Sequence, residues 1–94
     1  MKTQFNPSNG NIYQGQNQSD LQLTKQLNSY QSDGWVTFLQ ARNLGLKIIR
    51  GNKGTSIFRG YSTAYNKDKN GKIKKDYMPL GFAKVFNLDQ TQKV

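Results

Sequence analysis

The chain has 94 residues, of which 34% are hydrophobic, and it carries a formal net charge of +9. This length and apolar content suffice for one small core rather than two, and the lack of any run of about 18 apolar residues excludes a membrane-spanning helix. No apolar stretch follows Lys2 to serve as a signal peptide, so we expect the protein to stay in the cytoplasm of the cell that makes it.

The inventory of reactive side chains argues against an enzyme. Cysteine, histidine and glutamate are all absent, which removes disulfides, thiolate metal sites and the commonest general base and metal ligand. The remaining acids are five aspartates, Asp20, Asp33, Asp68, Asp76 and Asp89. Their spacing sets no two of them together as a metal or acid/base pair. We therefore expect no catalytic activity, no bound metal and no cofactor.

Positive charge is concentrated in one segment. Residues 1–41 and 76–94 each sum to zero, so the whole +9 lies between residues 42 and 75. The cations there, opposed by Asp68 alone, are Arg42, Lys47, Arg50, Lys53, Arg59, Lys67, Lys69, Lys72, Lys74 and Lys75. Such asymmetry is typical of nucleic-acid binders, because neutralising phosphates releases condensed counterions. For residues 66–75 alone, improved solubility is an equally good interpretation.

The first two segments differ in apolar pattern. Residues 1–18 are rich in Asn, Gln, Gly and Ser and predict an extended, partly ordered polar arm. Leu23, Leu27 and Tyr30 then form a helical stripe, and Ser19 and Gln22 have capping-box spacing. The pattern predicts an amphipathic helix over about residues 20–31 with its stripe in the core.

A second, shorter helix is predicted close behind. Thr37 and Gln40 repeat the capping-box spacing, so this helix should begin at Phe38 and close at Gly45. Trp35 precedes it, and we expect its ring in the core with the indole N–H hydrogen-bonded, base stacking being the alternative.

Two hairpins are expected next. Strands over residues 46–50 and 55–58 would flank a turn with Lys53 at its tip, where phosphate contacts are expected from Lys47, Arg50, Lys53 and Arg59. The strand continues over residues 59–65, and residues 66–72, which contain Asn-Gly, form a mobile tip. A return strand starts at residue 73, pauses around Pro79 and resumes over residues 82–86. Residues 91–94 should fray.

Faces of the last strand also differ. Phe82, Lys84 and Phe86 alternate on one side, which would make that side of the sheet both aromatic and basic.

Overall we expect an α+β domain over residues 19–90, with two short helices packed on one face of a small twisted antiparallel sheet of three to four strands. The helix from Phe38 is too short to read a duplex major groove, whereas interleaved aromatics and cations suit sequence-tolerant binding of single strands.

Four motifs occur in a consistent order along nearly the whole chain. They are Asn6-Pro7-x-x-Gly10-x-x-Tyr13-x-Gly15-x-Asn17, Trp35-x-Thr37-Phe38-x-Gln40-Ala41-x-x-Leu44-Gly45, Ile49-Arg50-Gly51-x-Lys53-Gly54-Thr55 and Val85-Phe86-Asn87-Leu88-Asp89-Gln90. Together they resemble the N-terminal single-stranded-DNA-binding domain of ArdC-type antirestriction proteins, which are found on conjugative plasmids and phages. Full-length family members usually continue into a zinc-metallopeptidase-like domain with a His-Glu-x-x-His helix. This chain ends before such a domain begins, so we expect only the DNA-binding half.

The resemblance also bears on single residues. Gly15 and Asn17 match a Gly-x-Asn that precedes the first helix in the family, although Asn17 is equally well interpreted as an N-terminal turn residue. The complete set of candidate nucleic-acid-binding residues is Lys47, Arg50, Lys53, Thr55, Phe58, Arg59, Tyr61, Lys84 and Asn17.

Two functions follow as hypotheses. The first is a sequence-tolerant single-stranded-DNA-binding protein of a plasmid or phage, acting in the bacterial cytoplasm to protect or escort DNA against host defence, with RNA not separable from DNA by composition. The alternative is a small anti-defence inhibitor that binds a host nuclease or defence complex through its basic face. The oligomeric state is left open.

Overall fold

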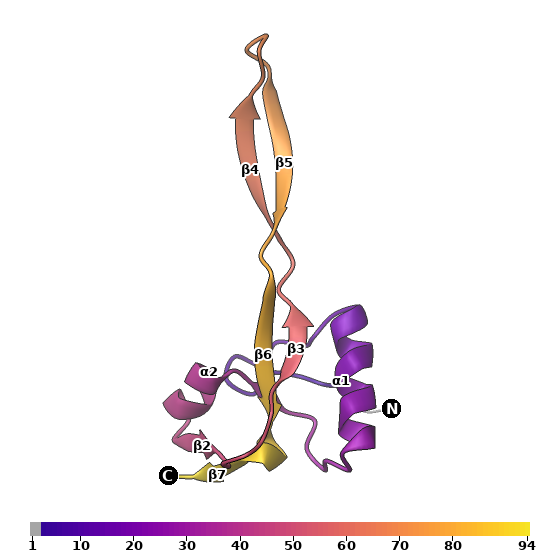
Figure 1. The fold of residues 1–94 in the computed structure, drawn as a ribbon, viewed down its shortest axis with the longest axis vertical. Helices are drawn as coiled ribbons and strands as arrows, with labels where there is room; N and C mark the ends of the chain where they lie inside the picture. The colour runs from indigo at the N-terminus through magenta and orange to yellow at the C-terminus, as the bar shows by residue number, and fades with distance from the viewer. Residues whose placement is uncertain (1–2) are drawn as a thin grey trace.

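The computed structural model describes residues 3–94 and has the α+β fold that the sequence predicts. Two parts are visible in Figure 1: a body that holds both helices, and a two-stranded ribbon that projects from it. The elements in chain order are α1 (Gln16–Leu27), β1 (Trp35–Val36), α2 (Phe38–Asn43), β2 (Leu46–Ile48), β3 (Thr55–Phe58), β4 (Tyr61–Lys67), β5 (Ile73–Pro79), β6 (Phe82–Asn87), the 3-10 helix η1 (Leu88–Gln90) and β7 (Thr91–Lys93). The ribbon makes the molecule elongated, with extents of 56 × 29 × 24 Å.

Strand β6 is the centre of the body. It pairs antiparallel with β1 on one side and β3 on the other, while β2 pairs with β7 and β4 pairs with β5. The predicted hairpin between residues 46–50 and 55–58 is therefore wrong, because its two strands belong to different sheets. Residues 91–94 were expected to fray, but β7 instead gives β2 its partner.

The hydrophobic core lies between α1 and the central sheet. Leu21, Trp35 and Val85 are fully buried there, and Ile57 packs against them. The expected place of Trp35 is confirmed: its indole Nε1 donates to Gln4 Oε1 at 2.7 Å. Burial of the ring therefore leaves no indole N–H unpaired.

Helix α2 begins where the sequence predicts, but α1 does not. Both hydrogen bonds of the Thr37–Gln40 capping box are present, and Gly45 follows α2 with a φ of 76°. In contrast, α1 begins at Gln16, after a Gly15 cap that makes no side-chain bond, and it ends at Leu27 rather than near residue 31. Within residues 3–94, no helix is both long enough and apolar enough to span a bilayer.

The two helices lie on opposite sides of β6 (Figure 1), not on one face as expected. Trp35 and Val36 are adjacent in β1 and both fully buried, and successive strand residues point to opposite faces. Both faces are thus covered at this end of the sheet, by α1 on the Trp35 side and by α2, which contacts β1 and β6, on the other.

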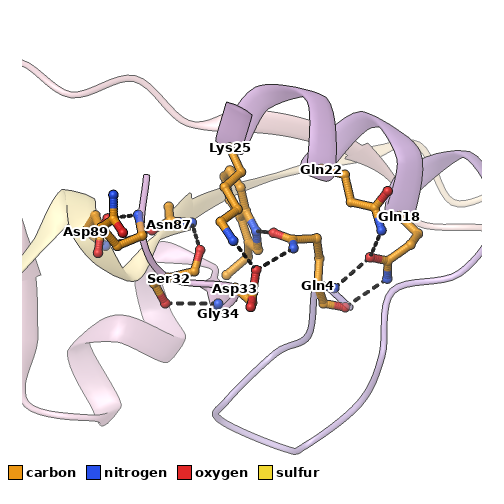
Figure 2. A network of polar contacts seen from close by, with 11 residues as sticks. Gln4, Gln18, Gln22, Lys25, Ser32, Asp33, Gly34, Asn87 and Asp89 are labelled. Atoms are coloured by element: carbon orange, nitrogen blue, oxygen red, sulfur yellow. Dashed lines mark hydrogen bonds and ion pairs between the residues drawn. The ribbon is translucent and has the colours of Figure 1, made fainter. Parts of the chain in front are cut away.

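The N-terminal segment, expected as a polar arm, is integrated into the body through amide hydrogen bonds. Gln4 is only 1% exposed. Its backbone N–H donates to Gln18 Oε1 at 2.6 Å, and Gln18 Nε2 returns a bond to the Gln4 carbonyl at 2.9 Å. Its side chain also donates to Asp33 Oδ1, which forms an ion pair with Lys25 (Figure 2). Hydrogen bonds of amide side chains thus hold this segment on the body, whereas apolar contacts hold the rest of the core together.

The ribbon consists of β4 and β5, seven residues each, in an unbroken antiparallel register from Tyr61↔Pro79 to Lys67↔Ile73. A turn forms at the predicted Asn-Gly, although β4 extends to Lys67 and so shortens the expected tip: Asp68 Oδ1 accepts the backbone N–H groups of Asn70 and Lys72, and Gly71 has a φ of 78°. At the base, Gly60 and Gly81 both have positive φ and separate the ribbon from β3 and β6. The strand predicted to continue through residues 59–65 is therefore interrupted at residues 59 and 60 and resumes at Tyr61.

Candidate nucleic-acid interface

Three aromatic rings gather where the ribbon leaves the body. Phe58 of β3 lies opposite Phe82 of β6 in the register, with ring centroids 5.5 Å apart, and its ring is 5.1 Å from that of Tyr61. Tyr61 is 63% exposed and Phe82 is 72% exposed. We call these three residues the aromatic platform; it presents two largely free ring surfaces to solvent.

Strand pairing explains why the platform rings meet. The backbone N–H of Phe58 donates to Asn17 Oδ1 at 2.9 Å, and Asn17 Nδ2 donates to the Phe58 carbonyl at 2.8 Å. Both polar groups of Phe58 therefore point away from β6, so Phe58 and Phe82 form a non-hydrogen-bonded pair, the kind in which facing side chains are closest. Asn17 lies in the first turn of α1, and both polar atoms of its amide bond to the Phe58 backbone, so it holds the outer edge of β3.

Lys84 extends the platform toward the body. Alternation places Ser56 and Lys84, the next cross-strand pair, at the same register level, and both are exposed. Phe58, Phe82, Ser56 and Lys84 share one face of the sheet because they are two residues apart along their strands. The expected aromatic and basic side of β6 is thus present, and α2 covers this face only beyond it, near Val36 and Phe86.

A basic loop over residues 49–54 adjoins this face. Gln90 fixes the loop at two points: its side-chain Nε2 donates to the Lys53 carbonyl at 2.9 Å, and its backbone carbonyl accepts the Ile49 N–H at 2.8 Å. Arg50 and Lys53 are exposed on it. A Cβ on Gly54 would lie 3.0 Å from the Lys84 Cβ, so the missing side chain lets the loop pass close to β6. The loop therefore adjoins this face at Lys84.

The other predicted residues lie elsewhere. Thr55 pairs with Val85 and shares its core-facing side, where Thr55 is half-buried. Arg59 follows Phe58 and leaves the opposite face, and Lys47 is exposed on β2 at the far end of the body. Of the nine candidates, Phe58, Tyr61 and Lys84 meet on one surface, Arg50 and Lys53 lie on the loop beside it, and the rest are separate.

Phe82 and Ser56 belong to this surface but were not among the nine candidate residues, although Phe82 was expected on the aromatic and basic side of its strand. The signal for Phe82 was its alternation with Lys84, but only the pairing of β3 with β6 shows that Phe58 faces it. Nothing local marks Ser56.

Aspartates of the body are engaged in internal contacts. Asp33 pairs with Lys25, and Asp89 accepts the backbone N–H of Gln31. Within residues 3–94, no three potential metal ligands cluster. These aspartates are therefore not part of the exposed aromatic and basic surface.

Two tyrosines of the body have shifted pKa values. Burial raises the pKa of Tyr13 to about 12, with hydrogen bonding to Asn6 opposing it, and burial together with the Asp89 carboxylate raises the pKa of Tyr30.

These features define a small α+β domain with an uncovered aromatic sheet face and a projecting ribbon. The sequence profile for the N-terminal domain of anti-restriction factor ArdC matches residues 1–88. The chain belongs to this family, which confirms the resemblance seen in its motifs.

Solved structures agree with this assignment. The metal-free crystal structure of the antirestriction ArdC protein from the R388 plasmid superposes with a TM-score of 0.81 at 32% identity, over 99% of this chain and 33% of that chain. The Mn(II)-bound structure of the same protein gives a TM-score of 0.69 at 27% identity, over 98% of this chain and 35% of that chain. The chain thus spans about a third of the length of the ArdC chain. Among curated proteins, none matches the sequence.

Proposed function

We propose that this ArdC-like antirestriction domain is a non-catalytic, sequence-tolerant binder of single-stranded DNA that protects or escorts the DNA of a plasmid or phage against host defence in the bacterial cytoplasm. The observation that carries the proposal is the aromatic platform beside Lys84 on an uncovered sheet face. Every base has a π-face, so exposed rings bind single strands without reading sequence, and nearby cations bind the backbone.

Electrostatics support the same conclusion. Arg50 and Lys53 lie on the loop that adjoins Lys84, and the net charge of +9 favours a polyanion. A duplex would offer the platform no free base faces, because its bases are stacked and paired. The domain should therefore prefer single strands.

The test is fluorescence anisotropy with a labelled mixed-sequence single strand over a salt series, with duplex DNA and RNA as competitors. Phe82→Ala should weaken binding by about 5- to 150-fold, as expected for loss of about 1–3 kcal/mol of stacking. Lys84→Gln should reduce the magnitude of the salt slope by about 0.7, and an Arg50→Ala, Lys53→Ala double variant by about twice that.

Two matched controls separate binding from general effects. Leu27→Ala removes a side chain that is 74% exposed, close to the 72% of Phe82, but lies on α1 on the other side of β6. Lys93→Gln removes an exposed cation on β7, away from the platform. Neither should change affinity more than about twofold, apart from the shared effect of net charge. No binding at low salt would overturn the proposal and direct attention to a protein of the host defence machinery as the target.

A further inference from the structure

The register of the ribbon divides its side chains into two chemically different faces. One face carries the pairs Tyr61↔Pro79, Thr63↔Tyr77, Tyr65↔Lys75 and Lys67↔Ile73. The other carries Ser62↔Met78, Ala64↔Asp76 and Asn66↔Lys74. We call the first the tyrosine face, because all three tyrosines of the ribbon lie on it. We call the second the small face, after its small residues Ser62 and Ala64.

Charge follows the same division. The tyrosine face has Lys67 and Lys75 and no acid. On the small face, Lys74 is offset by Asp76, whose carboxylate also accepts a hydrogen bond from Asn66 at 2.9 Å. Only the tyrosine face therefore combines aromatic rings with uncompensated positive charge.

Exposure of this face is not explained by folding. Tyr61, Tyr65 and Tyr77 are 63%, 68% and 64% exposed, and the ribbon projects away from both helices (Figure 1). Cross-strand pairs do help to hold a hairpin together, and Lys75 Nζ lies 5.4 Å from the centroid of the Tyr77 ring. Such pairing does not require that every ring occupy the same face, and contiguous exposed apolar surface in a soluble protein marks an interaction site.

The spacing of the rings fits a single strand. Tyr61, Tyr77 and Tyr65 occupy three successive levels of the ladder, each about 6.6 Å beyond the last. This is roughly twice the 3.4 Å rise per nucleotide in stacked DNA, which is the separation that two bases need to hold one ring between them. The contact between Phe58 and Tyr61 joins the first level to the aromatic platform.

We propose that the tyrosine face is a second stretch of the single-strand site, which continues from the platform residue Tyr61: bases beyond the platform stack against Tyr77 and Tyr65 in turn, while Lys75 and Lys67 contact phosphates. The inference rests on the proposed function. It adds a track of about 23 Å, from seven residues per strand, and thus predicts that affinity depends on strand length.

Oligothymidylates of increasing length test it, from about four to about sixteen nucleotides, the range of single-strand site sizes. For the unaltered protein, affinity should keep rising after the platform is filled. A Tyr65→Ala, Tyr77→Ala variant should bind the shortest strand normally and the longest at least tenfold more weakly. The matched control is Ser62→Ala, Met78→Ala on the small face, which should retain the full length dependence.

A Tyr65→Phe, Tyr77→Phe variant guards against a misfolded ribbon. It keeps both rings, so it should retain long-strand affinity if the rings act by stacking. In parallel, photo-crosslinking of the unaltered protein to an iodouridine-substituted strand, read by mass spectrometry, should give adducts on peptides from residues 61–67 or 73–79. Adducts confined to the body would overturn the inference.

The remaining outcomes separate the two proposals. Failure of every strand to bind at low salt overturns the proposed function itself. Equal binding of long strands by the unaltered protein and the tyrosine-to-alanine variant overturns the ribbon site while the platform stands. Loss of a dimer in that variant, seen by light scattering together with unchanged DNA affinity per protomer, would assign the face to a second copy of the chain and would also overturn the inference.

Discussion

The body and the ribbon use aromatic side chains in opposite ways. In the body, the Trp35 ring is fully buried and its N–H bonds to Gln4, and Tyr13 donates its hydroxyl proton to the Trp35 carbonyl at 2.9 Å. On the ribbon, Tyr65 and Tyr77 lie in solvent with no layer of the body over them. The comparison indicates that buried aromatic side chains contribute to the core of the body, whereas those of the ribbon remain exposed.

Truncation of a core side chain should show the largest difference between these parts. Leu21→Ala leaves a cavity beside Trp35 and Val85 and should lower the free energy of unfolding by about 2–5 kcal/mol. Ile73→Ala, at a ribbon position that is 70% exposed, should change it by about 0.5 kcal/mol or less. Urea denaturation followed by Trp35 fluorescence measures both. Equal losses would mean that the ribbon contributes to the core after all.

Removal of the buried amide comes next. Gln4→Leu keeps the side-chain volume but leaves the Trp35 indole N–H without its acceptor, so the free energy of unfolding should fall by about 1–3 kcal/mol. Gln14→Leu, at an exposed position of the same segment, is the control and should have little effect. If the two variants unfold at the same denaturant concentration, the amide network is not a source of stability.

The two hydrogen bonds between Asn17 and the Phe58 backbone connect the stability of the domain with the proposed binding. Asn17→Ala removes two hydrogen bonds to Phe58 and should cost about 1–2 kcal/mol of unfolding free energy. Because it frees the strand that carries Phe58, it should also weaken single-strand binding under conditions where the protein stays folded. Asn28→Ala, at the other end of α1, tests the specificity of the effect and should leave binding unchanged. Destabilisation without weaker binding would show that the Asn17 hydrogen bonds are not needed for binding at the platform.

The smallest effect is confined to high pH. Folded Tyr13 keeps its proton up to a pKa of about 12, whereas in the unfolded chain it loses the proton near pH 10. Between these values the folded state binds more protons than the unfolded state, so the free energy of unfolding should fall as the pH rises through this window. Tyr13→Phe should reduce that fall between pH 10 and 12. The same slope in the unaltered protein and the variant would contradict the assignment.

Local sequence patterns predicted where helices and turns form better than they predicted which strands pair. The start of α2 follows from Thr37 and Gln40 alone, and the ribbon tip from Asn70 and Gly71, because caps and turns are closed within a few residues. Strand partners are distant in sequence, and nothing in residues 46–50 distinguishes β7 from the nearer β3. The Ser19–Gln22 spacing was misleading since the same spacing also occurs within a helix, and α1 begins at a Gly15 that lacks a capping side chain.

The candidate site divides in the same manner. The concentration of cations and the alternation of Phe82 with Lys84 are visible in the sequence, but the platform exists only because β3 pairs with β6. Burial of Gln4, Asn87 and Gln90 was equally hidden, because hydropathy does not show whether a polar group will find its hydrogen-bond partners. Asn87, for example, caps η1 and is fully buried.

The unbroken register of the ribbon also limits how the domain can change. Adding two residues to each strand would lengthen the ribbon by one further level on each face and leave the body untouched. Adding one residue to each strand at the base would turn every side chain beyond it to the other face, moving the tyrosines from the platform side to the side that now holds Ala64 and Asp76. Ribbon length in related domains should therefore vary by two residues per strand at a time, which changes how far the ribbon projects without any change to the core.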